Sequence, residues 1–115
     1  MIKLYKGNCL EILPKFKDKF FDAIICDLPY GTTACKWDTV IPFEPMWEQL
    51  HRVIKDRGAI VLFGSEPFSS ALRMSNIKNY RYDWIWEKNT QTNGMNAKKH
   101  PLFNYEVISI FYKKH

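Results

Sequence analysis

The sequence lacks the features that mark membrane, secreted and metal-binding proteins. Its 115 residues contain no apolar run near the roughly 20 residues that cross a membrane, and the N-terminus has no long apolar stretch typical of a secretion signal. The three cysteines, Cys9, Cys26 and Cys35, form no Cys-x-x-Cys pair and have no histidine at metal-ligand spacing. We therefore expect a soluble, cytoplasmic protein with reduced cysteines, no metal site and no membrane partner.

Glycine is also scarce, and the glycines do not have the spacing of a nucleotide-binding motif. The five glycines never occur at Gly-x-Gly spacing, so the sequence contains no glycine-rich cofactor loop. It also contains no internal repeat, and no linker composition marks a second domain. We expect a single domain over residues 1–115.

What the sequence does contain is enough apolar mass for a core and an uneven distribution of charge. Apolar residues make up 46% and aromatic residues 16%, which is too much for a disordered chain. The formal net charge of +5 is concentrated at the basic ends, residues 1–20 and 78–115, while residues 21–77 are slightly acidic. Basic ends favour an acidic partner such as nucleic acid, although a solvated lysine-rich surface explains them equally well.

The hydrophobic pattern alternates between strands and helices. Continuous or alternating apolar runs predict about five strands, at residues 2–5, 20–27, 59–63, 80–88 and 106–112. Helical spacing predicts helices at residues 9–13, 44–57 and 67–74. This order favours an open, mostly parallel α/β sheet with an antiparallel last pair, whose ligands bind at the carboxyl ends of the strands. The aromatic stripe of Tyr82, Trp84 and Trp86 shares one strand face, which we expect to be core.

The segment after the first long strand carries the strongest chemical signal. Residues 27–31 read Asp-Leu-Pro-Tyr-Gly and open a loop, 28–43, without any periodicity. Pro29 fixes its own φ and biases Leu28 towards an extended backbone, so Asp27 and Tyr30 should be held rigidly. A strand end followed by a tight turn explains the same residues without any function.

Several segments resemble blocks of the DNA amino-methyltransferases, in the order that this family has them. Residues 6–13 and 21–31 resemble the family's opening, in which a Gly-Asp-Cys-Leu-Glu-like segment precedes a strand ending in Asp-Pro-Pro-Tyr. Residues 32–38, with Thr-Thr and Lys-Trp-Asp, resemble a loop of adenine-specific members, including those of bacteriophages. Later blocks are similar at residues 58–68, 86–89 and 99–106, so the resemblance spans nearly the whole chain.

The resemblance implies a partial S-adenosylmethionine-dependent methyltransferase fold, which is Rossmann-like, and a site-specific activity of the restriction-modification type. The methyl group of S-adenosylmethionine would pass to the exocyclic amine of an adenine flipped out of DNA. Asp27 and a backbone carbonyl of Leu28 or Pro29 would accept the amine hydrogens, and Tyr30 would stack on the base. The cofactor would contact Asn8, Cys9 and Asp27.

The second half of the chain offers candidate contacts to DNA. The loop at 88–100 is rich in amides and ends in basic residues, which suits phosphates and base edges, although it also fits a plain surface. For Glu106, in a late block, the alternative is an ion pair with a lysine at the sheet edge. The candidate DNA-binding residues are Lys36, Trp37, Lys88, Asn89, Lys98, Lys99 and His100.

The sequence departs from the family in three respects. Leu28 stands where the family has proline, and Asn8 stands where it has aspartate, so Asn8 is explained equally well as a helix cap. The glycine-rich cofactor loop is missing, as are about two of the seven expected strands. Three interpretations stay open: a truncated enzyme, a minimal enzyme completed by a homodimer or a complementing chain, or an inactive nucleic-acid-binding module. Cytosine-amino and RNA methylation are further alternatives.

Overall fold

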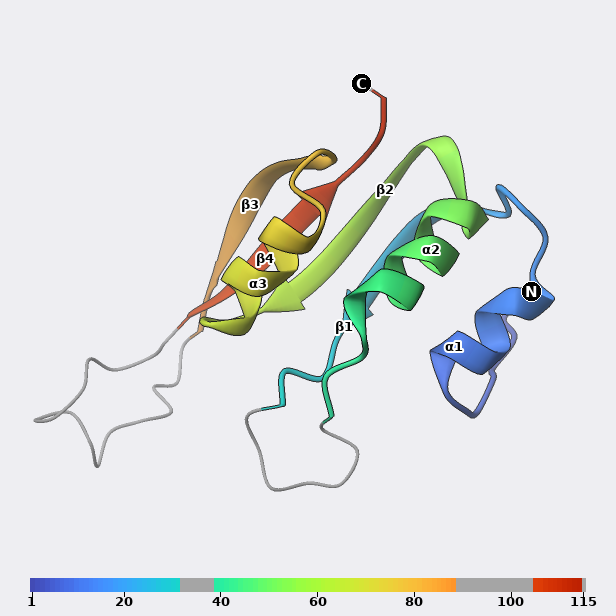
Figure 1. The fold of residues 1–115 in the computed structure, drawn as a ribbon, viewed down its shortest axis with the longest axis horizontal. Coiled ribbons are helices and arrows are strands. Elements are labelled where there is room, and N and C mark those ends of the chain that lie inside the picture. Colours follow the sequence, from blue (N-terminus) through green and yellow to red (C-terminus); the bar gives the residue numbers. More distant parts are fainter. Residues whose placement is uncertain (32–38, 89–104, 115) are drawn as a thin grey trace, which may run out of the picture.

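The computed structural model describes residues 1–31, 39–88 and 105–114 of the chain. Within these residues, the centre is a sheet in the order β1-β2-β4-β3, formed by β1 (Phe21–Asp27), β2 (Ile54–Gly64), β3 (Tyr80–Glu87) and β4 (Tyr105–Phe111). Two helices, α2 (Phe43–Val53) and α3 (Phe68–Ser75), lie against one face of the sheet (Figure 1). The short α1 (Cys9–Ile12) and the 3-10 turn η1 (Leu13–Lys15) contact α2. None of the described helices is long and apolar enough to cross a membrane.

The strand directions give a mixed sheet, in which the last pair is antiparallel as expected. β1 pairs with β2 in parallel, and β4 is antiparallel to both of its neighbours, β2 and β3. Three strands therefore run in one direction, with β4 inserted against them. The strand expected at residues 2–5 is wrong, because the side chains of Ile2 and Leu4 are more than 90% exposed and the segment has no regular structure.

The boundary between α2 and β2 also differs from the prediction. The helix expected at 44–57 ends at Val53, and β2 begins at Ile54 rather than at Ala59. Ile54 is extended, with φ −83° and ψ 140°, and lies opposite Phe21 of β1. Val53 and Ile54 are adjacent β-branched residues, which favour a strand over a helix. The change from helix to strand leaves Ile54 buried in the core.

The core lies between the sheet and the two helices. Met46, Trp47 and Leu50 recur at helical spacing on α2 and are buried against the sheet. The sheet contributes alternate residues, such as Ile60 and Leu62, to the same cluster. The other core members are Leu28, Ile54, Phe68, Leu72 and Phe111.

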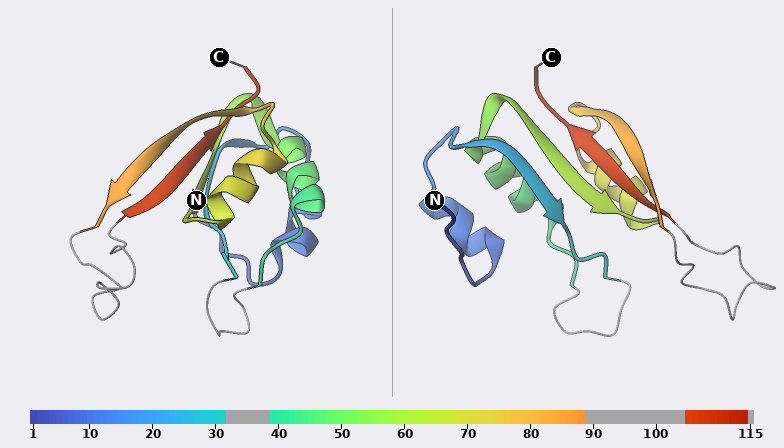
Figure 2. Two further views of the ribbon diagram at one scale, coloured as in Figure 1. Left: turned by 60° about the vertical axis from the view of Figure 1, so that its left-hand side comes forward. Right: turned by 180° about the vertical axis from the view of Figure 1, so that it is seen from behind.

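The opposite face of the sheet carries no helix among the described residues, as Figure 2 shows from behind and from the side. Tyr82, Trp84 and Trp86 lie on this face and are 44%, 55% and 47% exposed. The expectation that this stripe is core is therefore wrong. Its alternation is that of a strand, but both packed helices cover the other side of the sheet.

Candidate active site

The residue at the centre of the candidate site is Asp27, the last residue of β1. It lies opposite Phe63 of β2, so its carboxylate is at the carboxyl end of two parallel strands. The next side chain, Leu28, is 6% exposed and packs into the core, which anchors the chain as it leaves the strand. The turn closes at Gly31, whose φ of 74° lies in the left-handed region that favours glycine.

The hydroxyl of Tyr30 joins two carboxylates. Its oxygen lies 3.0 Å from Oδ1 of Asp27 and 2.8 Å from Oε1 of Glu106, a residue of β4. A phenol has only one proton, so it donates to one carboxylate at a time. Burial raises the pKa of Tyr30, and its hydrogen bonds to Glu106 and Asp27 raise it further. Tyr30 therefore stays protonated and serves as a hydrogen-bond donor, not as a base.

Glu106 is held from its other side by Lys88. The Nζ of Lys88 lies 2.7 Å from Oε2 of Glu106, and it sits over the ring of Trp86 at 5.3 Å from the ring centroid. This confirms the alternative for Glu106, an ion pair with a lysine at the sheet edge. The Glu106 side chain is 14% exposed, so the ion pair is better shielded from solvent than a typical surface pair.

The ring of Tyr30 is fixed by an aromatic stack. It lies against Phe68, the first residue of α3, with centroids 5.2 Å apart and planes 28° from parallel. Phe43 at the start of α2 contacts Phe68 in turn, with ring centroids 5.8 Å apart. The ring is therefore positioned by both helices, while its hydroxyl is positioned by β1 and β4.

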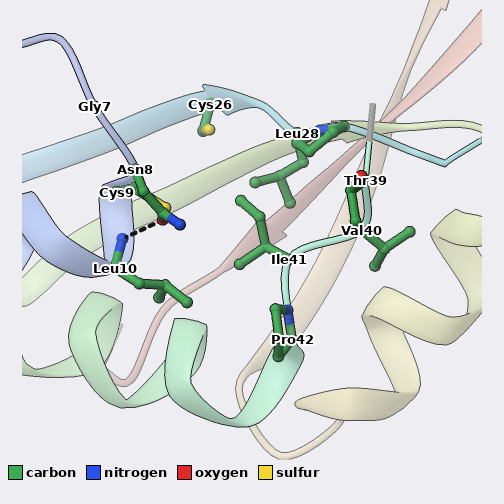
Figure 3. Close-up of a pocket in the computed structure, with 11 residues that line it drawn as sticks. Gly7, Asn8, Cys9, Leu10, Cys26, Leu28, Thr39, Val40, Ile41 and Pro42 are labelled. Carbon is green, nitrogen blue, oxygen red and sulfur yellow. Dashed lines mark hydrogen bonds between the residues drawn. The ribbon is translucent and has the colours of Figure 1, made fainter. Parts of the chain in front are cut away.

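A cavity of about 600 Å³ lies beside the end of β1 (Figure 3). Its lining comes from the segment 7–10, from β1 and the residues after it, and from the segment 39–42 that precedes α2. Cys9 and Cys26 both line it, and burial raises the pKa of each thiol, so neither is poised as a thiolate nucleophile. The lining residues are Gly7, Asn8, Cys9, Leu10, Cys26, Leu28, Pro29, Thr39, Val40, Ile41 and Pro42.

Asn8 is both a helix cap and a wall of this cavity. Its Oδ1 accepts a hydrogen bond from the backbone N–H of Leu10 at 2.9 Å, which caps α1. In Figure 3 the amide nitrogen of Asn8 points into the cavity. The side chain thus offers a ligand a hydrogen-bond donor, whereas the aspartate that the DNA amino-methyltransferases have at this position offers an acceptor.

The structure brings together the predicted residues of the first half of the chain. Asp27 and Tyr30 share the carboxylate cluster, while Asn8, Cys9, Leu28 and Pro29 line the cavity. Asp27, which the resemblance also assigns to the cofactor, does not line the cavity, because the alternation of β1 turns Cys26 towards it instead. The predicted residues that lie outside the described part of the chain are Cys35, Lys36, Trp37, Asn89, Lys98, Lys99 and His100.

Sequence reasoning missed Phe68 and the segment 39–42. Proline and an aromatic ring open α3 directly after β2, which is the signal that could have placed Phe68 near Tyr30. The segment 39–42 carries no periodicity, and only its position before α2 brings it to the cavity. Within the described residues, no group of three or more His, Cys, Asp or Glu side chains is placed to hold a metal ion.

The fold is similar to that of DNA methyltransferases of known structure. M1.HpyAVI, solved as its SAM complex, matches with a TM-score of 0.72 and 22% identity over 100% of this chain and 57% of that chain. PvuII DNA methyltransferase, which is cytosine-N4-specific, matches with a TM-score of 0.73 and 12% identity over 96% of this chain and 48% of its own. TTHA0409 of Thermus thermophilus is assigned as a DNA modification methylase and was solved in complex with S-adenosyl-L-methionine. It matches with a TM-score of 0.68 and 17% identity over 95% of this chain and 52% of that chain.

The chain spans about half the length of the solved structures it matches. No family model matches the sequence. The likeness confirms the predicted fold class, an α/β fold like part of the Rossmann-like fold of these solved structures, with an antiparallel strand in its sheet.

Proposed function

We propose that this chain is the catalytic part of a DNA methyltransferase that transfers a methyl group from S-adenosylmethionine to an exocyclic amine of a base. The observation that carries the proposal is the Asp27–Tyr30–Glu106 cluster at the carboxyl end of β1. The similarity in fold to M1.HpyAVI and to PvuII DNA methyltransferase supports it.

The chemistry of an exocyclic amine explains the need for a carboxylate and a neutral tyrosine. The nitrogen lone pair is delocalised into the base, and acceptors placed on the amine hydrogens favour the localised form that attacks a methyl group. Tyr30 lies closer to Glu106 than to Asp27, so its proton can remain on the Glu106 side. Asp27 then accepts one amine hydrogen, and a backbone carbonyl of Leu28 or Pro29 accepts the other.

The ring of Tyr30 provides the platform for a flipped base. Phe68 occupies one face of the ring and fixes its plane, so a base would stack on the opposite face. Stacking of this kind contributes about 1–3 kcal/mol per base. Phe68 therefore acts as a positioning residue for Tyr30.

The cavity beside β1 suits part of the cofactor. Its volume of about 600 Å³ lies within the range of roughly 300–1,000 Å³ typical of small-molecule sites, and its walls are mainly apolar. Asn8 and Cys9 would hold the adenosine end, with the amide of Asn8 donating to a ring nitrogen. S-adenosylmethionine, when bound, supplies the electrophilic methyl group.

Adenine is the proposed base, and cytosine is the second candidate. The resemblance of residues 32–38 to the loop of adenine-specific members supports adenine and a phage-like, restriction-modification role. The similarity to a cytosine-N4-specific enzyme supports cytosine as the second candidate. The exocyclic amines of adenine and cytosine need the same hydrogen-bond acceptors. Lys88 and the basic residues of the 88–100 loop would contact DNA, with Lys88 doing so while paired to Glu106.

The sequence contains no glycine-rich cofactor loop, so the proposal takes that loop from residues outside this sequence. A further part of the same protein, a second copy of the chain or a complementing chain would supply them. DNA is the macromolecular substrate, which fits a protein that acts in the cytoplasm.

The test compares Asp27→Asn with Asp22→Asn in an assay of labelled methyl transfer. Both are carboxylates of β1, but Asp22 is 87% exposed and pairs with Lys55 away from the cluster. We expect Asp27→Asn to reduce transfer by about a hundredfold or more, and Asp22→Asn to leave it unchanged. DNA substrates that carry adenine or cytosine as the sole amine-bearing target, and a matching RNA, distinguish the candidate bases.

Two results would contradict the enzymatic proposal. The first is the absence of both S-adenosylmethionine binding, measured by calorimetry, and label transfer, with the chain alone and with its completing partner. The second is transfer that survives Asp27→Asn. Salt-sensitive DNA binding without transfer would support the inactive nucleic-acid-binding module instead.

A further inference from the structure

Four side chains at the carboxyl end of β1 form one continuous line of polar contacts. Asp27 meets the hydroxyl of Tyr30, and the same hydroxyl meets Oε1 of Glu106. The other oxygen of Glu106, Oε2, meets Nζ of Lys88. The ammonium of Lys88 only donates, both carboxylates only accept, and the phenol between the carboxylates has a single proton. The direction in which that proton points therefore decides which carboxylate is left to accept from a substrate.

We propose that Glu106, oriented by Lys88, is a positioning residue that holds the hydroxyl proton of Tyr30. Its effect is to leave the carboxylate of Asp27 as an acceptor for the amine of the base. The inference deepens the proposed function and rests on it for the effect on methyl transfer. The direction of the Tyr30 hydrogen bond itself can be measured without cofactor or DNA.

The first argument is the different exposure of the two carboxylates. The side chain of Glu106 is 14% exposed, while Asp27 is an exposed residue. Water can hydrate Asp27, but a carboxylate that is shielded from water depends on donors of the protein. The proton of Tyr30 therefore contributes more on Glu106. This agrees with the shorter of the two contacts of the hydroxyl, 2.8 Å to Glu106 against 3.0 Å to Asp27.

The second argument is that Lys88 fixes which oxygen of Glu106 faces the phenol. Its Nζ lies 2.7 Å from Oε2, so Oε1 is the oxygen that turns to Tyr30. Lys88 is itself held over the ring of Trp86, 5.3 Å from the ring centroid. Trp86 pairs directly with Glu106 across β3 and β4, and Lys88 follows two residues later, so the register brings Lys88 alongside Glu106. The sheet therefore builds this ion pair independently of any contact with DNA.

The isosteric variant Glu106→Gln reverses the direction of the hydrogen bond in this arrangement. Its amide has one acceptor and one donor group in place of two acceptors. Lys88 takes the amide oxygen, because an ammonium does not accept, and the amide NH2 then donates to the oxygen of Tyr30. The phenol proton is driven onto Asp27, where it competes with the amine of the base. In the double variant with Lys88→Met, the amide can turn round and accept from Tyr30 again.

The first measurement follows the hydrogen bond in the chain without cofactor or DNA. The NMR shift of the phenolic carbon of Tyr30, Cζ, responds to the acceptor of its hydroxyl, and Tyr30→Phe assigns the resonance. We expect Glu106→Gln to move this resonance and Asp27→Asn to leave it nearly in place. A larger change in Asp27→Asn than in Glu106→Gln would place the proton on Asp27 and overturn the inference.

The second measurement is a double-mutant cycle in the methyl-transfer assay. We expect Glu106→Gln to lower kcat about tenfold, with little change in the KM for DNA, and Lys88→Met to lower kcat no more than about threefold. The double variant should recover about fivefold in kcat over Glu106→Gln alone. Lys55→Met is the matched control, because Lys55 makes an ion pair of the same length, 2.7 Å, with Asp22 at the other end of β1. It should leave kcat unchanged and give Glu106→Gln no recovery.

The outcomes separate this inference from the proposed function. Losses that multiply in the double variant, or a Lys88→Met loss confined to DNA affinity with a shallower salt dependence, would make Lys88 a phosphate contact and overturn the positioning role. The expected NMR shifts in a protein that transfers no methyl group uphold the role of Glu106 and contradict only the proposed function. Circular dichroism checks the fold of each variant. If Glu106→Gln does not fold, Asp27→Asn still decides, because a large change in the Tyr30 resonance overturns the inference and an unchanged resonance upholds it.

Discussion

Replacing Tyr30 with phenylalanine isolates the role of its hydroxyl. The ring and its stack on Phe68 remain, while the hydroxyl that donates to Asp27 or Glu106 is lost. Hydrogen bonds to charged groups contribute about 1.5–3 kcal/mol. Because the site is only partly buried, we take the lower end and expect Tyr30→Phe to lower the free energy of unfolding by about 1–2 kcal/mol.

For a chain of this length, that loss corresponds to a fall in Tm of roughly 4–8 °C. The matched control is Tyr5→Phe, since Tyr5 is 55% exposed and its ring meets only the edge of Phe16 in the described residues. Differential scanning calorimetry measures both variants. In the transfer assay, Tyr30→Phe should reduce kcat about tenfold and leave DNA affinity nearly unchanged, whereas Tyr30→Ala should also weaken DNA binding about tenfold.

The pH dependence of stability gives an independent test of the same contact. The pKa of Tyr30 is raised in the folded chain above its ordinary value of 10.0, chiefly by burial and then by the two carboxylates. Above pH 10 the unfolded chain therefore binds fewer protons at this residue than the folded chain does, and stability falls as pH rises. Urea unfolding from about pH 8 to pH 11 should give a shallower decline for Tyr30→Phe than for the wild type. Equal slopes and equal Tm values would refute the bridging role of the hydroxyl.

Three further predictions concern the scaffold of the site. Burial, reinforced by the nearby Lys113, lowers the pKa of His51 below its ordinary 6.5, so stability should fall as pH drops below about 6.5, and His51→Gln should flatten this dependence in urea titrations. Asn8→Ala should cost about 1 kcal/mol by removing the cap of α1, while Asn8→Asp should keep the cap, as thermal unfolding would show. Arg52 donates to two backbone carbonyls before β1, so Arg52→Met should cost about 2 kcal/mol by chemical denaturation, and an unchanged midpoint would contradict those contacts.

The local parts of the site were predictable from the sequence because their causes are local. A proline-fixed turn after an apolar strand is enough to place Asp27 and Tyr30 at the carboxyl end of β1. The cap at Asn8 follows from its side chain and the helical spacing after it. In both cases, the residues that decide the geometry are within a few positions of each other.

The rest depended on contacts between distant segments. The pairing of Tyr30 with Glu106 spans 76 residues and follows from the insertion of β4 next to β2, which no spacing in the sequence specifies. The helix expected to continue to residue 57 gives way at Ile54, because pairing with Phe21 buries that side chain. Apolar residues alternate along β3 as they do in a strand with one buried face. Only the placement of α2 and α3 on the other face of the sheet shows that Trp84 and Trp86 point away from the core.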